Sequence, residues 1–163
     1  MFGKKGKAMK KIILIFFVLI SSFGTLQAQN GFLSVGAKFG YAFGSEGGFI
    51  FGVEGSYFHL SDGKSFGAVL SIDAWENTRR FHLGVESNFD GQQNVYLNLV
   101  GFEIGPTLLL RNGEVDLGLG VTPYAGILII PYYTFTYFDK DFMMHEAGSY
   151  LKVPILLEGD LSQ

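Results

Sequence analysis

The chain has 163 residues, enough for one domain and too few for two. Hydrophobic residues make up 48% of it and charged residues only 17%, whereas the surface of a soluble domain is about 25–35% charged. Part of the exterior is therefore expected not to face water. The lack of cysteine excludes disulfides, thiolate metal sites and thiol nucleophiles, and the 23 Gly, 17 Phe and 8 Tyr residues are typical of an aromatic-rich β protein.

The N-terminus has the residue order of a secretory signal. Five lysines precede the apolar run 12–20, and small residues follow it up to Ala28. The run is too short to span a bilayer, which takes about 20 residues, so it predicts a signal core. We expect a signal peptide over residues 1–28 and a barrel domain over residues 29–163. That domain has 7 basic and 15 acidic side chains, a net charge of −8, which argues against binding to nucleic acid.

From residue 32 onward, apolar and polar residues alternate in segments separated by turn-forming clusters. Alternation with period two predicts half-buried antiparallel strands. The clean segments are 32–43, 47–60, 65–74, 80–86, 114–129 and 150–158.

The remaining segments are less regular. Segment 94–110 changes its apolar face near Val100, which indicates a bulge. Segment 131–138 could place either its odd-numbered or its even-numbered residues on the apolar face; we call this choice the parity of a strand. The pair Asn112–Gly113 suits a two-residue hairpin turn, and 139–148 is the longest predicted loop. The count is about eight strands.

The distribution of size and charge indicates which face of the strands lies inside. All charged residues of the clean segments share the polar face, which both a lipid-facing exterior and a soluble core would require. That polar face is also rich in Gly and Ser, which fit the narrow inside of an eight-strand barrel. The bulky face is therefore predicted to touch lipid, through Phe39, Tyr41, Phe49, Phe51, Val53, Tyr57, Leu70, Leu83, Leu119 and Val153.

The charged residues of the polar face predict a network inside the barrel. Opposite charges on neighbouring strands can pair there, although the same side chains could instead lie in water near the rims. The predicted network consists of Lys38, Glu54, Asp73, Arg80, Glu86, Asp116 and Lys152. The fold class is accordingly all-β, a small antiparallel up-and-down transmembrane β-barrel of about eight strands.

Patterns for catalysis and for cofactors are weak in this sequence. His145–Glu146 lacks the second histidine of a zinc-protease helix, and the segment 118–123 lacks the third glycine of a dinucleotide-binding loop. His82 shares the polar face of its strand with Glu86, but a catalytic triad needs three groups within hydrogen-bond reach. We expect no catalytic residue, no metal site and no cofactor, and hence no enzyme.

Two segments resemble a known family. SYLKVPILL, residues 149–157, looks like the Tyr-Leu-x-Ile-Pro-Leu-Leu-Leu strand of the PorT-type outer-membrane β-barrel family of Bacteroidetes-like bacteria, and GAKFGYAFG, residues 36–44, is similar to its glycine-spaced first strand. In that family more strands usually follow the proline-containing strand, whereas six residues follow Leu157 here. The sequence leaves open whether the barrel closes differently or is incomplete at the C-terminus.

These observations together predict a small outer-membrane barrel, located there after signal cleavage. Its role would be structural, adhesive or secretion-accessory, and its filled interior would not form an open diffusion pore. The expected partners are outer-membrane lipid and, through loops, envelope or secretion proteins. The alternative is a soluble periplasmic or secreted β-barrel that binds an apolar ligand inside.

Overall fold

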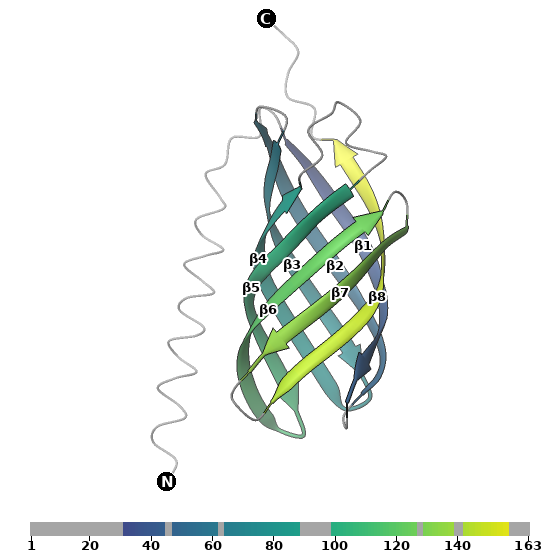
Figure 1. The fold of residues 1–163 in the computed structure, drawn as a ribbon, viewed down its shortest axis with the longest axis vertical. Coiled ribbons are helices and arrows are strands. Elements are labelled where there is room, and N and C mark those ends of the chain that lie inside the picture. The colour runs from purple at the N-terminus through teal and green to yellow at the C-terminus, as the bar shows by residue number, and fades with distance from the viewer. Residues whose placement is uncertain are drawn as a thin grey trace, which may run out of the picture.

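The protein forms a closed antiparallel barrel of eight strands (Figure 1). A computed structural model describes residues 31–44, 47–61, 64–88, 99–126, 129–138 and 142–156, so the predicted signal peptide lies outside the described residues. The strands are β1 (Gly31–Phe43), β2 (Gly48–Ser61), β3 (Lys64–Trp75), β4 (Thr78–Asn88), β5 (Leu99–Arg111), β6 (Glu114–Gly126), β7 (Ile129–Tyr137) and β8 (Met143–Leu156). Among these residues, the structure contains no helix that is long and apolar enough to cross a lipid bilayer.

The barrel closes because β8 pairs with β1. The ladder runs from Phe32 opposite Leu156 to Phe43 opposite His145, and every other strand pairs with its neighbours in the chain. Of the two possibilities that the sequence leaves open, the structure shows a closed barrel, whose closing contact is the pair β8–β1. Closure satisfies the backbone N–H and C=O groups that an open sheet edge would leave unpaired.

Two predicted boundaries differ from the structure. The segment 114–129 comprises two strands, since β6 ends at Gly126 and β7 begins at Ile129. Ala125 and Ile129 have the same parity, so the alternation gives no sign of the turn between them. The predicted loop 139–148 is also too long, because β8 begins at Met143. At the start of β8 the apolar Met144 points inward and the polar His145 points outward. This is the reverse of the alternation in the other strands, so the sequence did not predict a strand here.

The hairpin predicted at Asn112–Gly113 is confirmed. Arg111 of β5 pairs with Glu114 of β6, and the two residues between them have φ angles of 49° and 80°. A two-residue turn of the primed type requires such positive φ values at both positions, and Asn followed by Gly is the pair that tolerates them best.

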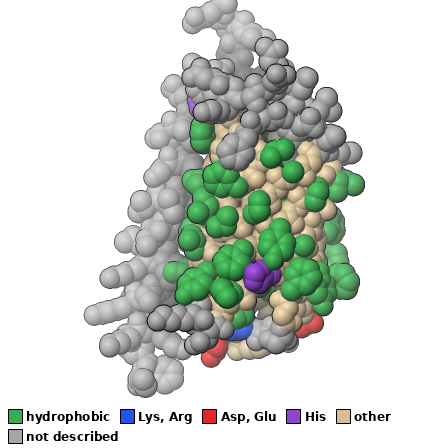
Figure 2. Space-filling model, in the orientation of Figure 1, with side chains coloured by type: hydrophobic (Ala, Val, Ile, Leu, Met, Phe, Trp, Pro, Cys, Tyr) green, Lys and Arg blue, Asp and Glu red, His purple; other side chains and the backbone are tan. Residues whose placement is uncertain are grey.

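The outer surface of the barrel is apolar. Figure 2 shows hydrophobic side chains spread over the visible face of the described strands, with charged side chains near its lower edge. Of the residues predicted to face lipid, eight have exposed side chains: Phe39, Tyr41, Phe49, Phe51, Val53, Leu70, Leu119 and Val153. Aromatic rings pack against each other on this surface, as Phe39 does with Phe51 and Tyr41 with Phe49.

The prediction that Leu83 lies open to lipid is wrong. Leu83 points to the same side of the strand as Phe81 and Val85, but only 7% of the residue's surface is exposed. Leu70 lies directly opposite it on β3. Tyr57 is half-buried on its strand. The parity of a residue determines the side of the sheet to which its side chain points. The neighbouring side chains determine what fraction of its surface is exposed.

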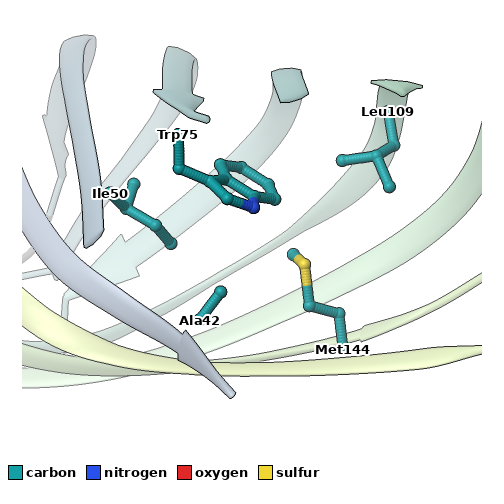
Figure 3. Packing of buried hydrophobic residues seen from close by; sticks show 5 residues of the cluster. All are labelled: Ala42, Ile50, Trp75, Leu109 and Met144. Carbon is teal, nitrogen blue, oxygen red and sulfur yellow. The ribbon is translucent and has the colours of Figure 1, made fainter. Parts of the chain in front are cut away.

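One end of the interior holds a cluster of apolar side chains, which we call the apolar plug (Figure 3). Its members come from five strands and point toward one another across the barrel, with Phe138 and Phe142 packed against them. They lie where β1 ends and β8 begins, at the end of the barrel opposite the start of β1. The plug consists of Ala42, Ile50, Trp75, Leu109 and Met144.

Candidate functional site

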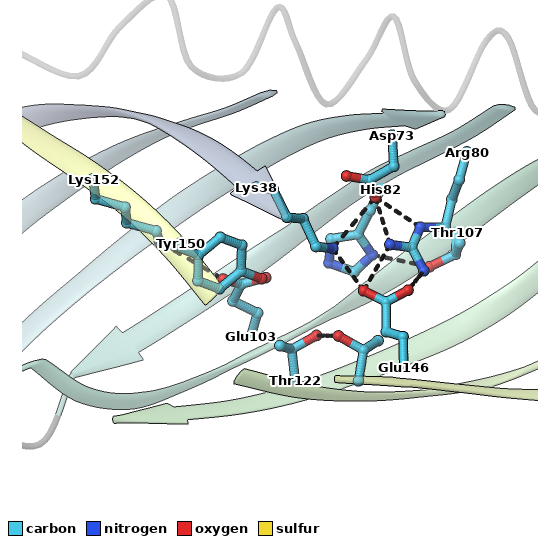
Figure 4. Close-up of polar contacts among 11 residues, drawn as sticks. Lys38, Asp73, Arg80, His82, Glu103, Thr107, Thr122, Glu146, Tyr150 and Lys152 are labelled. Atoms are coloured by element: carbon cyan, nitrogen blue, oxygen red, sulfur yellow. Dashed lines mark hydrogen bonds and ion pairs between the residues drawn. The ribbon is translucent and has the colours of Figure 1, made fainter. Parts of the chain in front are cut away.

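The middle of the barrel is filled by buried charged side chains (Figure 4). Six strands contribute them, and their inward direction follows from the alternation of each strand. They form two groups, one beside the apolar plug and one further along the barrel. The buried charged residues are Lys38, Glu54, Asp73, Arg80, Glu86, Glu103, Glu146 and Lys152.

The group beside the plug consists of Arg80, Lys38, Asp73 and Glu146, and we call it the arginine cluster. Arg80 Nε donates to Asp73 Oδ2 at 2.8 Å, and its Nη2 donates to Glu146 Oε1 at 2.9 Å. Lys38 Nζ lies 2.9 Å from Glu146 Oε1 and 3.3 Å from Asp73 Oδ2. The guanidinium also lies 5.6 Å from the ring of Trp75 in the plug. Two cations and two carboxylates therefore neutralise one another here.

The second group, the lysine cluster, consists of Lys152, Glu54, Glu86 and Glu103. Lys152 Nζ lies 3.0 Å from Glu86 Oε1 and 3.7 Å from Glu103 Oε1, and it also forms an ion pair with Glu54. The same ammonium lies 4.8 Å from the ring centre of Tyr150, whose hydroxyl donates to Glu103 Oε2 at 3.5 Å. One cation here faces three carboxylates.

Six of the seven residues predicted for the inner network lie in these two clusters, and Asp116 does not. Asp116 lies near the β5–β6 turn, where its Oδ2 accepts from Arg111 Nη2 at 3.2 Å and its side chain is 32% exposed. Its parity matches that of the inner residues, but its position along the strand places it at the rim. The prediction that it joins the buried network is therefore wrong.

Glu103 and Glu146 were not predicted, although both are central to the clusters. Glu146 belongs to the stretch that the sequence assigned to a loop, and Glu103 belongs to the segment in which the sequence indicated a bulge near Val100. The bulge prediction is wrong for the described part of this strand, because β5 pairs with β6 without a break from Leu99 to Arg111. A signal was present, because Glu103 alternates with the apolar Phe102 and Ile104. A strand assignment for 143–156 would likewise have put Glu146 on the same face as Lys152.

His82 faces a small polar cavity between the clusters. Its Nδ1 is hydrogen-bonded to Thr107 Oγ1 at 2.9 Å, so its described partner is a hydroxyl and not Glu86. Across the cavity, the hydroxyls of Thr122 and Thr134 are hydrogen-bonded to each other at 2.8 Å. The cavity has room for little more than a water molecule, and its wall also includes Lys38, Ser71, Arg80, Glu103 and Thr136.

The clusters restrict the size of neighbouring residues, and Gly52 gives a test. A methyl group at Gly52 would lie 2.1 Å from Asp73 Oδ1 and 2.9 Å from the carbonyl oxygen of Ile72. We expect Gly52→Ala to lower the free energy of unfolding by about 1–3 kcal/mol, because the carboxylate and strand β3 must shift. Urea unfolding in detergent micelles would measure the change.

Gly55 provides the matched control on the same strand. A methyl group there would meet nothing within 4 Å, so Gly55→Ala is expected to leave stability unchanged or to raise it by about 0.5–1 kcal/mol. Equal losses for both variants would contradict the role that we assign to the contact between Gly52 and Asp73.

Comparison with known proteins supports the fold and leaves the family open. No family model matches the chain, and no curated protein matches it significantly in sequence, so membership of the PorT-type family stays a prediction. Among solved structures, Neisserial surface protein A (NspA) is similar with a TM-score of 0.58. The match covers 77% of this chain and 96% of that chain at 12% sequence identity. At this identity, the likeness shows that the two proteins share a barrel fold.

Proposed function

We propose that the protein is a small outer-membrane β-barrel with a structural or accessory role and without an open diffusion pore. The observation that carries the proposal is the distribution of side chains. Among the described residues, 23 large apolar side chains are exposed, whereas eight charged ones are buried inside the barrel. This arrangement is the reverse of the usual one in soluble domains and is typical of barrels in lipid.

The energetics support lipid as the surrounding medium. Soluble monomers rarely expose contiguous apolar patches larger than a few hundred Å², and here the apolar face extends over all eight strands. Val53 and Phe49, for example, keep 59% and 73% of their surfaces exposed. In a bilayer those side chains meet acyl chains at no cost, and the closed ladder leaves no sheet edge in lipid.

The interior supports the absence of a pore. The apolar plug, the arginine cluster and the lysine cluster follow one another along the barrel and fill it with side chains. Within the described part of the barrel, the same filling argues against the alternative of a soluble barrel with an apolar ligand, because the cavity that the described residues line is polar and water-sized. Lipid is therefore the proposed partner, and envelope or secretion proteins would bind through the connections between strands.

Cell fractionation followed by electrophoresis tests this proposal. We expect the protein in the outer-membrane fraction, with faster mobility in SDS without boiling than after boiling. The shift is expected because a closed barrel resists SDS until heat breaks its ladder. A boiled and unboiled pair of a known outer-membrane barrel from the same fraction serves as the control.

Recovery in the soluble fraction without detergent would contradict the proposal. Membrane recovery without any shift in mobility would also contradict it, since it would indicate an associated but unclosed chain. Neither outcome depends on knowing a partner or a ligand.

A further inference from the structure

The small polar cavity beside His82 contains two polar atoms in need of a partner. His82 and Thr136 are 6% and 0% exposed and line the cavity, and neither His82 Nε2 nor Thr136 Oγ1 has a hydrogen-bond partner among the described atoms. Buried polar atoms in native proteins almost always have a partner, and a buried water molecule often supplies it. The hydroxyls of Thr107, Thr122 and Thr134 line the same space and can each bind a further group. The cavity is therefore suited to hold a water molecule.

Side chains fill the described barrel on both sides of this cavity. On one side lie the arginine cluster and the apolar plug. On the other side lie the lysine cluster and the stacked rings of Phe32 and Phe58, whose centres are 4.7 Å apart. A route along the barrel axis would have to pass these packed groups, so the wall of the barrel is the place to look for a path.

That wall is least paired between β6 and β7. Residues 122–126 of β6 lie beside residues 130–134 of β7, and we call this stretch the proline seam. The described ladder contains a single pair there, Tyr124 with Tyr132, whereas β1 pairs with β8 without a break. The proline seam extends to the end of β6 at Gly126, so the weak pairing reaches the rim of the barrel.

Two prolines account for the weak pairing. The register of the Tyr124 pair places Pro123 opposite Tyr133 and Pro131 opposite Ala125. Proline has no N–H, so neither residue can donate a hydrogen bond to the neighbouring strand. The two strands are therefore held together less firmly here than elsewhere.

The inner end of the proline seam lies at the cavity. Thr122 of β6 and Thr134 of β7 belong to the cavity wall, and their hydroxyls, 2.8 Å apart, join the strands where the ladder has no pair. The described ladder between β4 and β5 also has a gap, at Leu83 and Gly84 beside Pro106, but ladder pairs continue on both sides of it. That gap does not reach the rim, whereas the proline seam connects the rim with the cavity.

We propose that the cavity binds one water molecule, held by His82 Nε2 and Thr136 Oγ1, and that local opening of the proline seam admits it. The seam opens when the Tyr124–Tyr132 pair and the hydroxyl bond behind it separate, which disrupts far fewer contacts than opening a continuous ladder. Its outer end lies at the rim, so the path does not cross the hydrocarbon of a bilayer. Larger solutes stay excluded, because the cavity is water-sized.

NMR of the refolded full chain in detergent micelles tests the water site. We expect a cross peak between water and the ring protons of His82, and none for the ring of Phe58, which is buried against Phe32. Thr136→Val keeps the shape of the side chain, removes one partner of the water molecule and is expected to weaken the His82 peak. Absence of the peak in the wild type overturns the site. A peak of unchanged strength in Thr136→Val also overturns it, since the signal would then come through the Thr107 hydroxyl.

Hydrogen exchange in the same micelles tests the path. The amides of Ala125 and Tyr133 are expected to exchange at least about tenfold faster than that of Gly36, which lies in the continuous β1–β8 ladder. Pro123→Ala supplies the missing N–H and is expected to slow the Tyr133 amide about tenfold, whereas Pro106→Ala at the other gap leaves it unchanged.

Equal exchange rates in the proline seam and at Gly36 would overturn the path. A folded Pro123→Ala variant with the wild-type rate at Tyr133 would do the same. If that variant does not fold, the comparison within the wild type decides alone.

Discussion

Arg80→Ala is expected to lower the free energy of unfolding by about 3–5 kcal/mol. The substitution removes the donor that joins Asp73 on β3 to Glu146 on β8 and leaves Lys38 alone with two buried carboxylates. The loss is large because those carboxylates cannot regain water. Urea titration in detergent micelles, read by the mobility of the folded form in SDS, measures it.

Arg79 is the matched control, one residue earlier on the same strand. Its side chain is exposed and donates to the backbone carbonyl of Thr78, so Arg79→Ala is expected to change stability by less than about 0.5 kcal/mol. Arg80→Lys keeps the charge but loses the fork of donors, and an intermediate loss is expected. If Arg80→Ala were as stable as Arg79→Ala, the arginine cluster would not hold the strands together.

Val53→Arg is expected to lower the stability of the barrel in lipid vesicles by about 2–4 kcal/mol. Val53 lies near the middle of β2, 59% exposed, between Ala37 and Ile72 of the neighbouring strands. An arginine there would have to leave water for the acyl chains of the bilayer. Reversible unfolding from vesicles by denaturant, followed by tryptophan fluorescence of Trp75, measures the difference.

The outcome for Val53 distinguishes the two surroundings proposed for the apolar face. In a soluble barrel the same arginine would project into water and change stability by less than about 0.5 kcal/mol. Val53→Leu, which keeps the position apolar, is the control and is expected to behave like the wild type. A neutral result for Val53→Arg in vesicles would mean that this face does not touch lipid.

The sequence predicts much of this fold because alternation determines which side chains point inward. Lys38, Asp73, Arg80 and Lys152 could be assigned to the interior because strands β1, β3, β4 and β8 alternate cleanly around them. The aromatic exterior follows from the same rule. What the rule gives is the direction of a side chain relative to its own strand.

Alternation does not give the register between strands, the degree to which a side chain is covered, or the residues that it contacts. The wrong predictions have these causes. Asp116 has the inward parity but lies at the rim, and Leu83 has the outward parity but is covered. Glu146 could not be paired with Arg80, 66 residues earlier in the chain, without the closed barrel. The clusters depend on contacts between distant strands, which a single sequence does not specify.

The closing strand carries a consequence for the order of assembly. β8 supplies Glu146, which completes the arginine cluster, and Lys152, the cation of the lysine cluster. Until β8 docks on β1, the arginine cluster contains the cations Lys38 and Arg80 with Asp73 as their single acid. The lysine cluster then contains three glutamates and no cation. Partly built intermediates are therefore penalised twice, by an unpaired edge and by unbalanced charge. Folding is then expected to be all-or-none, because barrels in which β8 has not yet docked carry unpaired buried charges and are too unstable to accumulate.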